Sequence, residues 1–138
     1  MPALDTSVLV RYLIQDDTSQ LAAARRLIRN CVDQQQTLFV PVTVTLELEW
    51  VLRSSFGYPK DTTILVLSSL LSAVELSFES EHALEVALDL YRRNGADFAD
   101  CLHLALAAQA GEQPLWTFDK GASKLPGAQL MGRRPPTL

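Results

Sequence analysis

Short apolar segments alternate with helix-length segments along this sequence, and this alternation restricts its fold more than any other feature. Each apolar segment has the length of a buried strand. Strands that alternate with helices pair side by side in a parallel sheet. The sequence therefore predicts an α/β fold with strands over residues 2–4, 38–42, 74–76, 115–118 and 128–131.

The segments between these strands have the length of helices and are bounded by capping and turn residues. Asp17 and Thr18 can cap the second of them, and Gly57, Gly95 and Gly111 follow the third, the fifth and the sixth. No internal repeat is visible. We expect one domain over residues 1–138, with helices at 7–14, 18–32, 43–56, 61–71, 80–93 and 97–110.

The amount of apolar sequence suits a single core, since 48% of the 138 residues are apolar. No apolar run approaches the roughly 18 residues that cross a bilayer, and the first residues lack the basic and apolar parts of a secretion signal. We therefore expect no membrane association and a cytoplasmic location. Cys31 and Cys101 have no neighbouring thiols, which excludes a zinc knuckle and predicts two small buried side chains.

The net charge of -4 argues against broad electrostatic adhesion to nucleic acid. Cations bound in a pocket of carboxylates would reverse the sign of the charge locally and weaken this objection. Walker loops, dinucleotide-binding glycine motifs and serine elbows do not occur in the sequence. A glycosidase carboxylate pair stays open by residue type, although its usual scaffolds are larger.

Two aspartates directly follow predicted strands. Asp5 stands where the first strand ends and a helix begins, which is the edge of the sheet where open α/β folds build their sites. Asp119 follows the apolar run at 115–118 and precedes a Lys-Gly turn. Each also has an ordinary structural role to consider: a helix cap for Asp5 and a turn aspartate for Asp119.

Two glutamates lie on the predicted helix 43–56 and differ in their neighbours. Glu47 has apolar residues on both sides of it, and a charge against an apolar surface requires a partner such as a metal ion. Glu49 has Arg53 four residues later, the spacing of a surface salt bridge. Glu47 is therefore the candidate ligand. The expected apolar stripe of this helix is Val44, Leu48, Val51 and Leu52.

The apolar segment 97–110 predicts a buried helix whose first turns carry three polar side chains. Asp97 is suited to be its N-cap. Asp100 could complete a poor capping box, but we favour a metal-ligand role for it. His103 is expected to be a hydrogen-bonded core residue outside the metal site.

The four acids Asp5, Glu47, Asp100 and Asp119 offer only oxygen ligands. Such a set suits Mg²⁺ or Mn²⁺ and does not suit zinc. Hard divalent cations of this kind activate water for attack at phosphate. Arg11 and Arg53 are candidates for contact with the phosphates.

The segments around these acids resemble the motifs of PIN-domain proteins, in the branch of VapC-like toxins of type II toxin-antitoxin pairs. The resemblance covers nearly the whole chain, and four motifs in this order are specific. The opening motif is Asp5-Thr6-Ser7, in which Thr6 supports the aspartate and Ser7 departs from the usual Asn. The others are Glu47-Leu48-Glu49-Trp50-Val51-Leu52-Arg53, Asp97-Phe98-Ala99-Asp100-Cys101-Leu102 and Thr117-Phe118-Asp119.

The resemblance implies a PIN-like three-layer fold, with a central parallel sheet flanked by helices. It implies that Glu47, Asp100 and Asp119 join Asp5 as ligands, with Asp97 as an auxiliary acid and Thr117 orienting Asp119. It further implies an Mg²⁺- or Mn²⁺-dependent endoribonuclease, a homodimer and a cognate antitoxin that covers the site.

Two other interpretations remain open at this stage. The chain could keep the fold as a non-catalytic module that binds nucleic acid or protein, because fold does not fix function. A phosphatase that uses Asp5 as nucleophile is the weaker alternative. It would require a second acid two residues later, where Ser7 stands.

Overall fold

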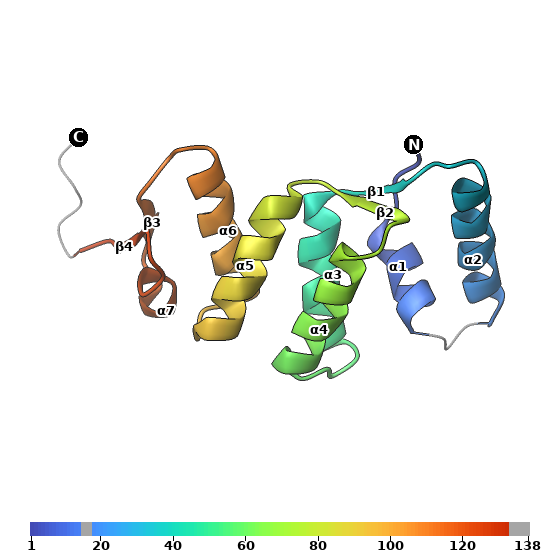
Figure 1. Cartoon of the computed structure of the whole chain (residues 1–138). Coiled ribbons are helices and arrows are strands. Elements are labelled where there is room, and N and C mark those ends of the chain that lie inside the picture. The colour runs from blue at the N-terminus through green and yellow to red at the C-terminus, as the bar shows by residue number, and fades with distance from the viewer. Residues whose placement is uncertain (15–17, 133–138) are drawn as a thin grey trace. The chain divides into compact units, whose positions relative to one another are not determined.

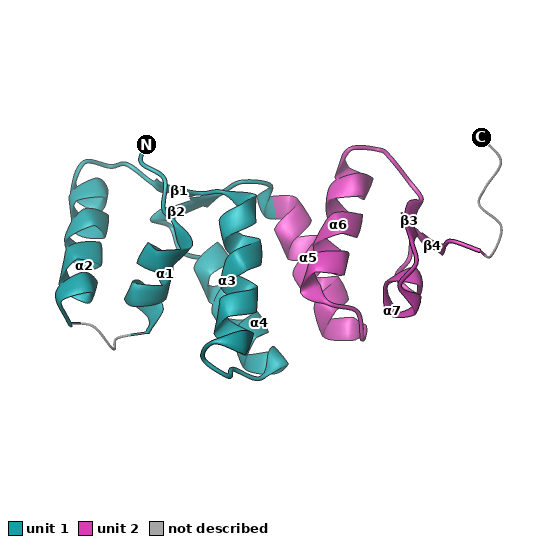
Figure 2. Cartoon of the chain, turned by 180° about the vertical axis from the view of Figure 1, so that it is seen from behind, with its two compact units in different colours: residues 1–81 teal, residues 82–138 magenta. Residues whose placement is uncertain are grey.

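The computed structural model describes residues 1–14 and 18–132 of the chain. The chain divides into two compact units, residues 1–81 and residues 82–138, which Figure 2 distinguishes by colour. The first unit holds α1 (Thr6–Leu13), α2 (Thr18–Asp33), β1 (Leu38–Val40), α3 (Val42–Ser54), α4 (Lys60–Leu71) and β2 (Leu76–Phe78). The second holds α5 (Glu81–Arg93), whose first residue belongs to the first unit, α6 (Phe98–Gln109), β3 (Leu115–Thr117), α7 (Lys120–Ser123) and β4 (Ala128–Leu130).

Parallel pairing organises the first unit. Strands β1 and β2 lie side by side in Figure 1, with Leu38 opposite Leu76. The chain before α1 adds a third parallel segment through a bridge between Ala3 and Phe39. The amide of Leu4 donates to the carbonyl of Phe39 over 2.8 Å, and the amide of Phe39 donates to the carbonyl of Pro2 over 2.8 Å. Three chain segments therefore end at one edge of this small sheet.

Helix α3 begins at that edge, directly after β1. Pro41 occupies its N-cap, where the fixed φ of proline and its missing N–H carry no penalty. The carboxylate of Glu79, which follows β2, accepts the N–H of Val42 over 2.8 Å. A helix N-terminus has unpaired N–H groups and a partial positive charge, so this acid stabilises the start of α3.

The second unit also contains a parallel pair. Leu115 lies opposite Ala128 and Thr117 opposite Leu130, and the short helix α7 stands in the connection between the two strands. Helices α5 and α6 pack through the rings of Tyr91 and Phe98, whose centroids are 5.6 Å apart. Aromatic pairs at this distance and tilt attract one another beyond their area of contact.

The α/β architecture with parallel strands is confirmed, and each of the six predicted helices forms within two residues of its expected limits. Cys31 and Cys101 are buried, as expected. The predicted cap Asp17 lies outside the described residues. The described strands pair as two separate ladders, one in each unit, so a single continuous sheet stays a prediction. No described helix combines the length and the apolar composition of a membrane span.

Two predicted strands had the wrong limits, and one short helix was not predicted. The strand placed at 74–76 runs from Leu76 to Phe78, because Val74 lies in the turn after α4 and is 88% exposed. The strand placed at 38–42 stops at Val40, since Pro41 caps α3. Helix α7 was not predicted, because four residues are too few for a periodic pattern.

We predict that Glu79→Ala lowers the free energy of unfolding by about 1 kcal/mol, because the N–H of Val42 loses its charged acceptor. Urea denaturation measures the change. The control is Glu85→Ala, which removes an exposed acid from the middle of α5 and should alter stability by less than about 0.5 kcal/mol. Equal losses in the two variants would contradict the capping role.

Candidate active site

Asp5 occupies the N-cap position of α1, but its carboxylate does not accept a helix N–H. The backbone carbonyl of Asp5 accepts the N–H of Val8 over 3.1 Å. Its exposed side chain accepts a hydrogen bond from the Ser7 hydroxyl, with 3.1 Å between Oγ and Oδ2. The side-chain capping role considered for Asp5 is therefore wrong. Ser7, where related motifs carry Asn, contacts the acid directly.

Glu47 and Glu49 exchange the environments that the sequence suggested for them. Glu47 is exposed, whereas Glu49 is only 2% exposed. The buried face of α3 consists of Thr45, Leu48, Glu49 and Leu52, so Leu48 and Leu52 of the predicted stripe are buried, whereas Val44 and Val51 are only partly buried. The prediction that Glu47 lies against an apolar surface was therefore wrong. Glu47 remains a ligand candidate as an exposed carboxylate.

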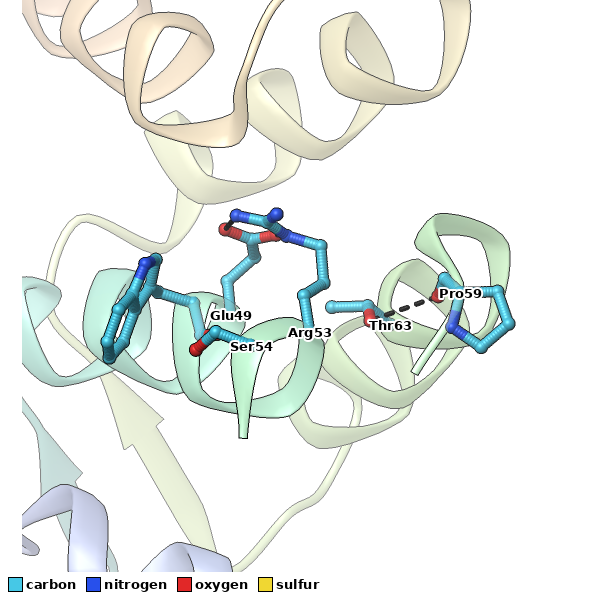
Figure 3. Close-up of polar contacts among 6 residues, drawn as sticks. Glu49, Arg53, Ser54, Pro59 and Thr63 are labelled. Carbon is cyan, nitrogen blue, oxygen red and sulfur yellow. Dashed lines mark hydrogen bonds and ion pairs between the residues drawn. The ribbon is translucent and has the colours of Figure 1, made fainter. Parts of the chain in front are cut away.

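Glu49 is paired with Arg53, as its spacing predicted, although the pair is not on the surface. Arg53 donates from Nε to one Glu49 oxygen and from Nη2 to the other, the second bond being 3.1 Å long. Figure 3 shows the two side chains meeting beside α3. A buried carboxylate requires such a partner, because an unpaired buried charge is strongly destabilising. Arg53 therefore has a structural role, and its contact with phosphate stays a prediction.

Two buried threonines lie one and two positions from candidate acids in the sequence, Thr6 from Asp5 and Thr45 from Glu47. In the described part of the chain, Oγ1 of Thr6 and Oγ1 of Thr45 have no hydrogen-bond partner, although the residues are 5% and 2% exposed. Leaving a buried hydroxyl unpaired costs about 1–3 kcal/mol. Such groups indicate a partner of another kind, either water or an ion. Thr45 was not among the residues singled out from the sequence. It is a polar residue on the buried face of α3.

Asp119 is held by the turn between β3 and α7. Its Oδ1 accepts the N–H of Ala122 over 3.1 Å, so the carboxylate caps α7. Its own N–H donates to Oγ1 of Thr117 over 3.0 Å, which places Thr117 as a direct support of the turn. A Cβ on Gly121 would lie 3.2 Å from Oδ1 of Asp119, closer than most such contacts. Glycine therefore leaves room for this carboxylate.

Asp97 and Asp100 lie at the start of α6. Asp97 is the N-cap by position, without a side-chain capping bond, and Asp100 is in the first turn. Burial raises the pKa of the Asp100 carboxyl, the charges of Asp119 and Asp97 raise it further, and His103 acts in the opposite direction. Asp119 and Asp97 are thus each near enough to Asp100 to disfavour its negative charge. His103 is exposed, so its expected place in the core was wrong.

The predicted ligands come from both units: Asp5 and Glu47 from residues 1–81, and Asp100 and Asp119 from residues 82–138. Among the residues that the structure describes, no three His, Cys, Asp or Glu side chains form a group that could hold a metal ion. The structure describes Asp5 and Glu47 within the first unit, and Asp100 and Asp119 within the second. That all four acids form one metal site stays a prediction.

The donors present fit a hard divalent cation. All four candidates are carboxylates, which Mg²⁺ and Mn²⁺ prefer. Asp5 is not used in capping, and the charge on Asp100 is disfavoured by its surroundings. In the first unit, the buried hydroxyls of Thr6 and Thr45 are two further oxygen atoms without a partner among the described residues.

Comparison with known proteins identifies the family of this chain. The family model described as the PIN domain matches residues 3–128. The chain belongs to the PIN domain family. The PIN fold is an α/β fold, in agreement with the helices and parallel strands described above. This PIN domain is also similar to the VapC ribonuclease of Aquifex aeolicus (strain VF5), with 24% identity over 125 residues that cover 91% of this chain and 92% of that protein.

We predict that Asp100→Asn raises the melting temperature of the metal-free protein at neutral pH. A carboxyl with a raised pKa binds its proton more tightly in the folded chain than in the unfolded chain. Its ionisation therefore lowers stability as the pH rises through the two pKa values. Thermal unfolding in EDTA measures the gain, which should vanish in acid, where wild-type Asp100 is protonated.

The matched control is Asp61→Asn, which also neutralises an acid in the first turn of a helix. Asp61 is exposed on α4, where its charge favours the helix N-terminus by about 0.3–1 kcal/mol. Its removal should lower the melting temperature or leave it unchanged. A loss of stability in Asp100→Asn as well would show that repulsion among the acids is not significant.

Proposed function

We propose that this PIN domain is a metal-dependent endoribonuclease and the toxin of a toxin-antitoxin pair. Asp100 carries the proposal, because burial and the charges of Asp119 and Asp97 disfavour its ionised form until a cation compensates it. The similarity to a protein named VapC ribonuclease, over nearly the full length of both chains, supports RNA as the substrate.

Asp5, Glu47, Asp100 and Asp119 would hold Mg²⁺ or Mn²⁺ in this proposal. The bound cation supplies a water of lowered pKa and compensates charge on the phosphodiester. Ser7 holds the Asp5 carboxylate, and the turn at Thr117 holds Asp119. These side chains position the acids. Asp97 stands beside Asp100 as an auxiliary acid.

The remaining parts of the proposal concern binding partners. Arg11 and Arg53 would contact RNA phosphates, and for Arg53 this contact would have to coexist with its bond to Glu49. A homodimer, a cognate antitoxin that covers the acids and a cytoplasmic location complete the proposal. They follow from the resemblance to VapC-like toxins, which the named relative supports.

The experiment that tests the activity compares two glutamates on one helix. Glu47→Gln should reduce RNA cleavage by more than the roughly 10–100-fold that follows loss of an outer-shell partner, because it removes a direct ligand. Its stability should be unchanged, since Glu47 is exposed. Glu49→Gln should lower the free energy of unfolding and retain cleavage, because the ion pair with Arg53 becomes a hydrogen bond to a neutral side chain. Cleavage sites are mapped on total cellular RNA with added Mn²⁺.

Asp5→Asn is the second loss-of-cleavage variant, and it reports on the N-terminal acid alone. Undiminished cleavage in both Asp5→Asn and Glu47→Gln would point to a contaminating nuclease and reject the proposed site. If the wild type binds RNA in Mn²⁺ without cutting it, the chain is instead a non-catalytic binding module.

Metal binding gives a prediction that does not depend on the RNA. Mn²⁺ at about 100 times its dissociation constant should stabilise the wild type by roughly 2.7 kcal/mol, a rise of several degrees in melting temperature. The double variant Asp100→Asn, Asp119→Asn should show no rise, and Asp61→Asn should respond as the wild type does. An equal rise in the double variant would exclude these two acids as ligands.

A further inference from the structure

A cavity of about 330 Å³ opens between α1 and α2, inside the first unit. Its wall on α1 consists of Ser7, Val8 and Arg11. Its wall on α2 consists of residues spaced three or four apart, which share one face of that helix. They are Gln20, Ala23, Ala24 and Leu27. This volume is at the lower end of the range of about 300–1,000 Å³ that is usual for small-molecule sites.

The cavity is connected to a proposed metal ligand through Ser7. The Ser7 hydroxyl donates to the carboxylate of Asp5, and the same residue lines the cavity. A group seated in the cavity would therefore lie against the residue that donates to the Asp5 carboxylate. Neither the motifs nor the composition of the sequence indicated this cavity.

The chemistry of the lining suits a nucleobase and its phosphate. Val8, Ala24 and Leu27 offer aliphatic surface to a flat ring. The amide of Gln20 can donate to and accept from the edge of a base. Arg11 carries a planar cation that pairs with phosphate or stacks on a base. We propose that this cavity binds one base of the RNA adjacent to the scissile phosphate, and so sets the nucleotide preference of cleavage.

The charge on α2 favours RNA over an acidic or neutral partner as the source of this group. Arg25, Arg26 and Arg29 are exposed on the helix, on sides turned away from the cavity residues, against one acid, Asp33, in a chain with a net charge of -4. They do not line the cavity and would meet RNA outside it. Positive charge of this kind raises the local concentration of a polyanion. The inference rests on the proposed ribonuclease activity, whose substrate it specifies further.

The test fills the cavity without touching the proposed ligands. Ala23 is exposed and lines the cavity, so Ala23→Leu should project into it and leave the core intact. We expect a loss of at least tenfold in kcat/KM on the preferred RNA, because small changes in pocket volume discriminate by roughly 10–200-fold. Mapping of cut sites in a pool of random-sequence RNA should show altered preference at one nucleotide position.

The matched control is Ala22→Leu, an identical change on an exposed neighbour that is not among the lining residues. It should keep the wild-type rate and preference. Leu27→Ala, which enlarges the cavity, should relax the preference toward larger bases. Wild-type rates and cut sites in both Ala23→Leu and Leu27→Ala would overturn the proposal, and the cavity would then belong to a protein partner.

Failure of the inference is distinguishable from failure of the proposed function. If the wild type cleaves and the cavity variants match it, only the base site is rejected. If the wild type does not cleave, the nuclease proposal fails first. Photo-crosslinking of 4-thiouridine RNA to Asp5→Asn then decides the base site: a crosslink to α1 or α2 supports it, and crosslinks confined to other peptides reject it.

Discussion

The backbone of Phe39 pairs on both sides of its peptide with the segment before α1, and the first unit depends on this contact. Its N–H and C=O fix the chain before Asp5 parallel to β1. Parallel segments end at the same edge, so α1 and α3 begin together there, and Glu79 closes the start of α3. The backbone register thus brings the helices that carry Asp5 and Glu47 to one edge before any side chain of the site is considered.

Three aspartates of the motifs stand at the starts of helices. Asp5, Asp97 and Asp119 all occupy N-cap positions, yet only Asp119 uses its carboxylate to cap. The partial positive charge of a helix N-terminus makes such positions tolerable for anions. Even so, the pKa of Asp100 in the first turn of α6 is raised, so burial and repulsion outweigh the helix charge there. The fold therefore accepts an electrostatic cost that a bound cation would relieve.

Helix positions and the parallel pairing were predictable from the sequence, because the spacing of apolar residues and the positions of capping and turn residues are local properties of the chain. The face of α3 that is buried was not predictable in the same way. Its buried face includes Thr45 and Glu49, two polar residues that a search for apolar stripes rejects. The ion pair with Arg53 helps to make Glu49 acceptable in the interior. Likewise, Asp97 has the right residue type for a cap, but its side chain does not form the bond.

The order of the acids along the chain has a consequence for synthesis on the ribosome. Asp5 and Glu47 belong to the first unit, whereas Asp119 lies on the turn before α7 in the second. A nascent or prematurely released chain that stops before this turn lacks one of the proposed ligands. The proposed set of four acids is therefore incomplete until the turn before α7 has been synthesised.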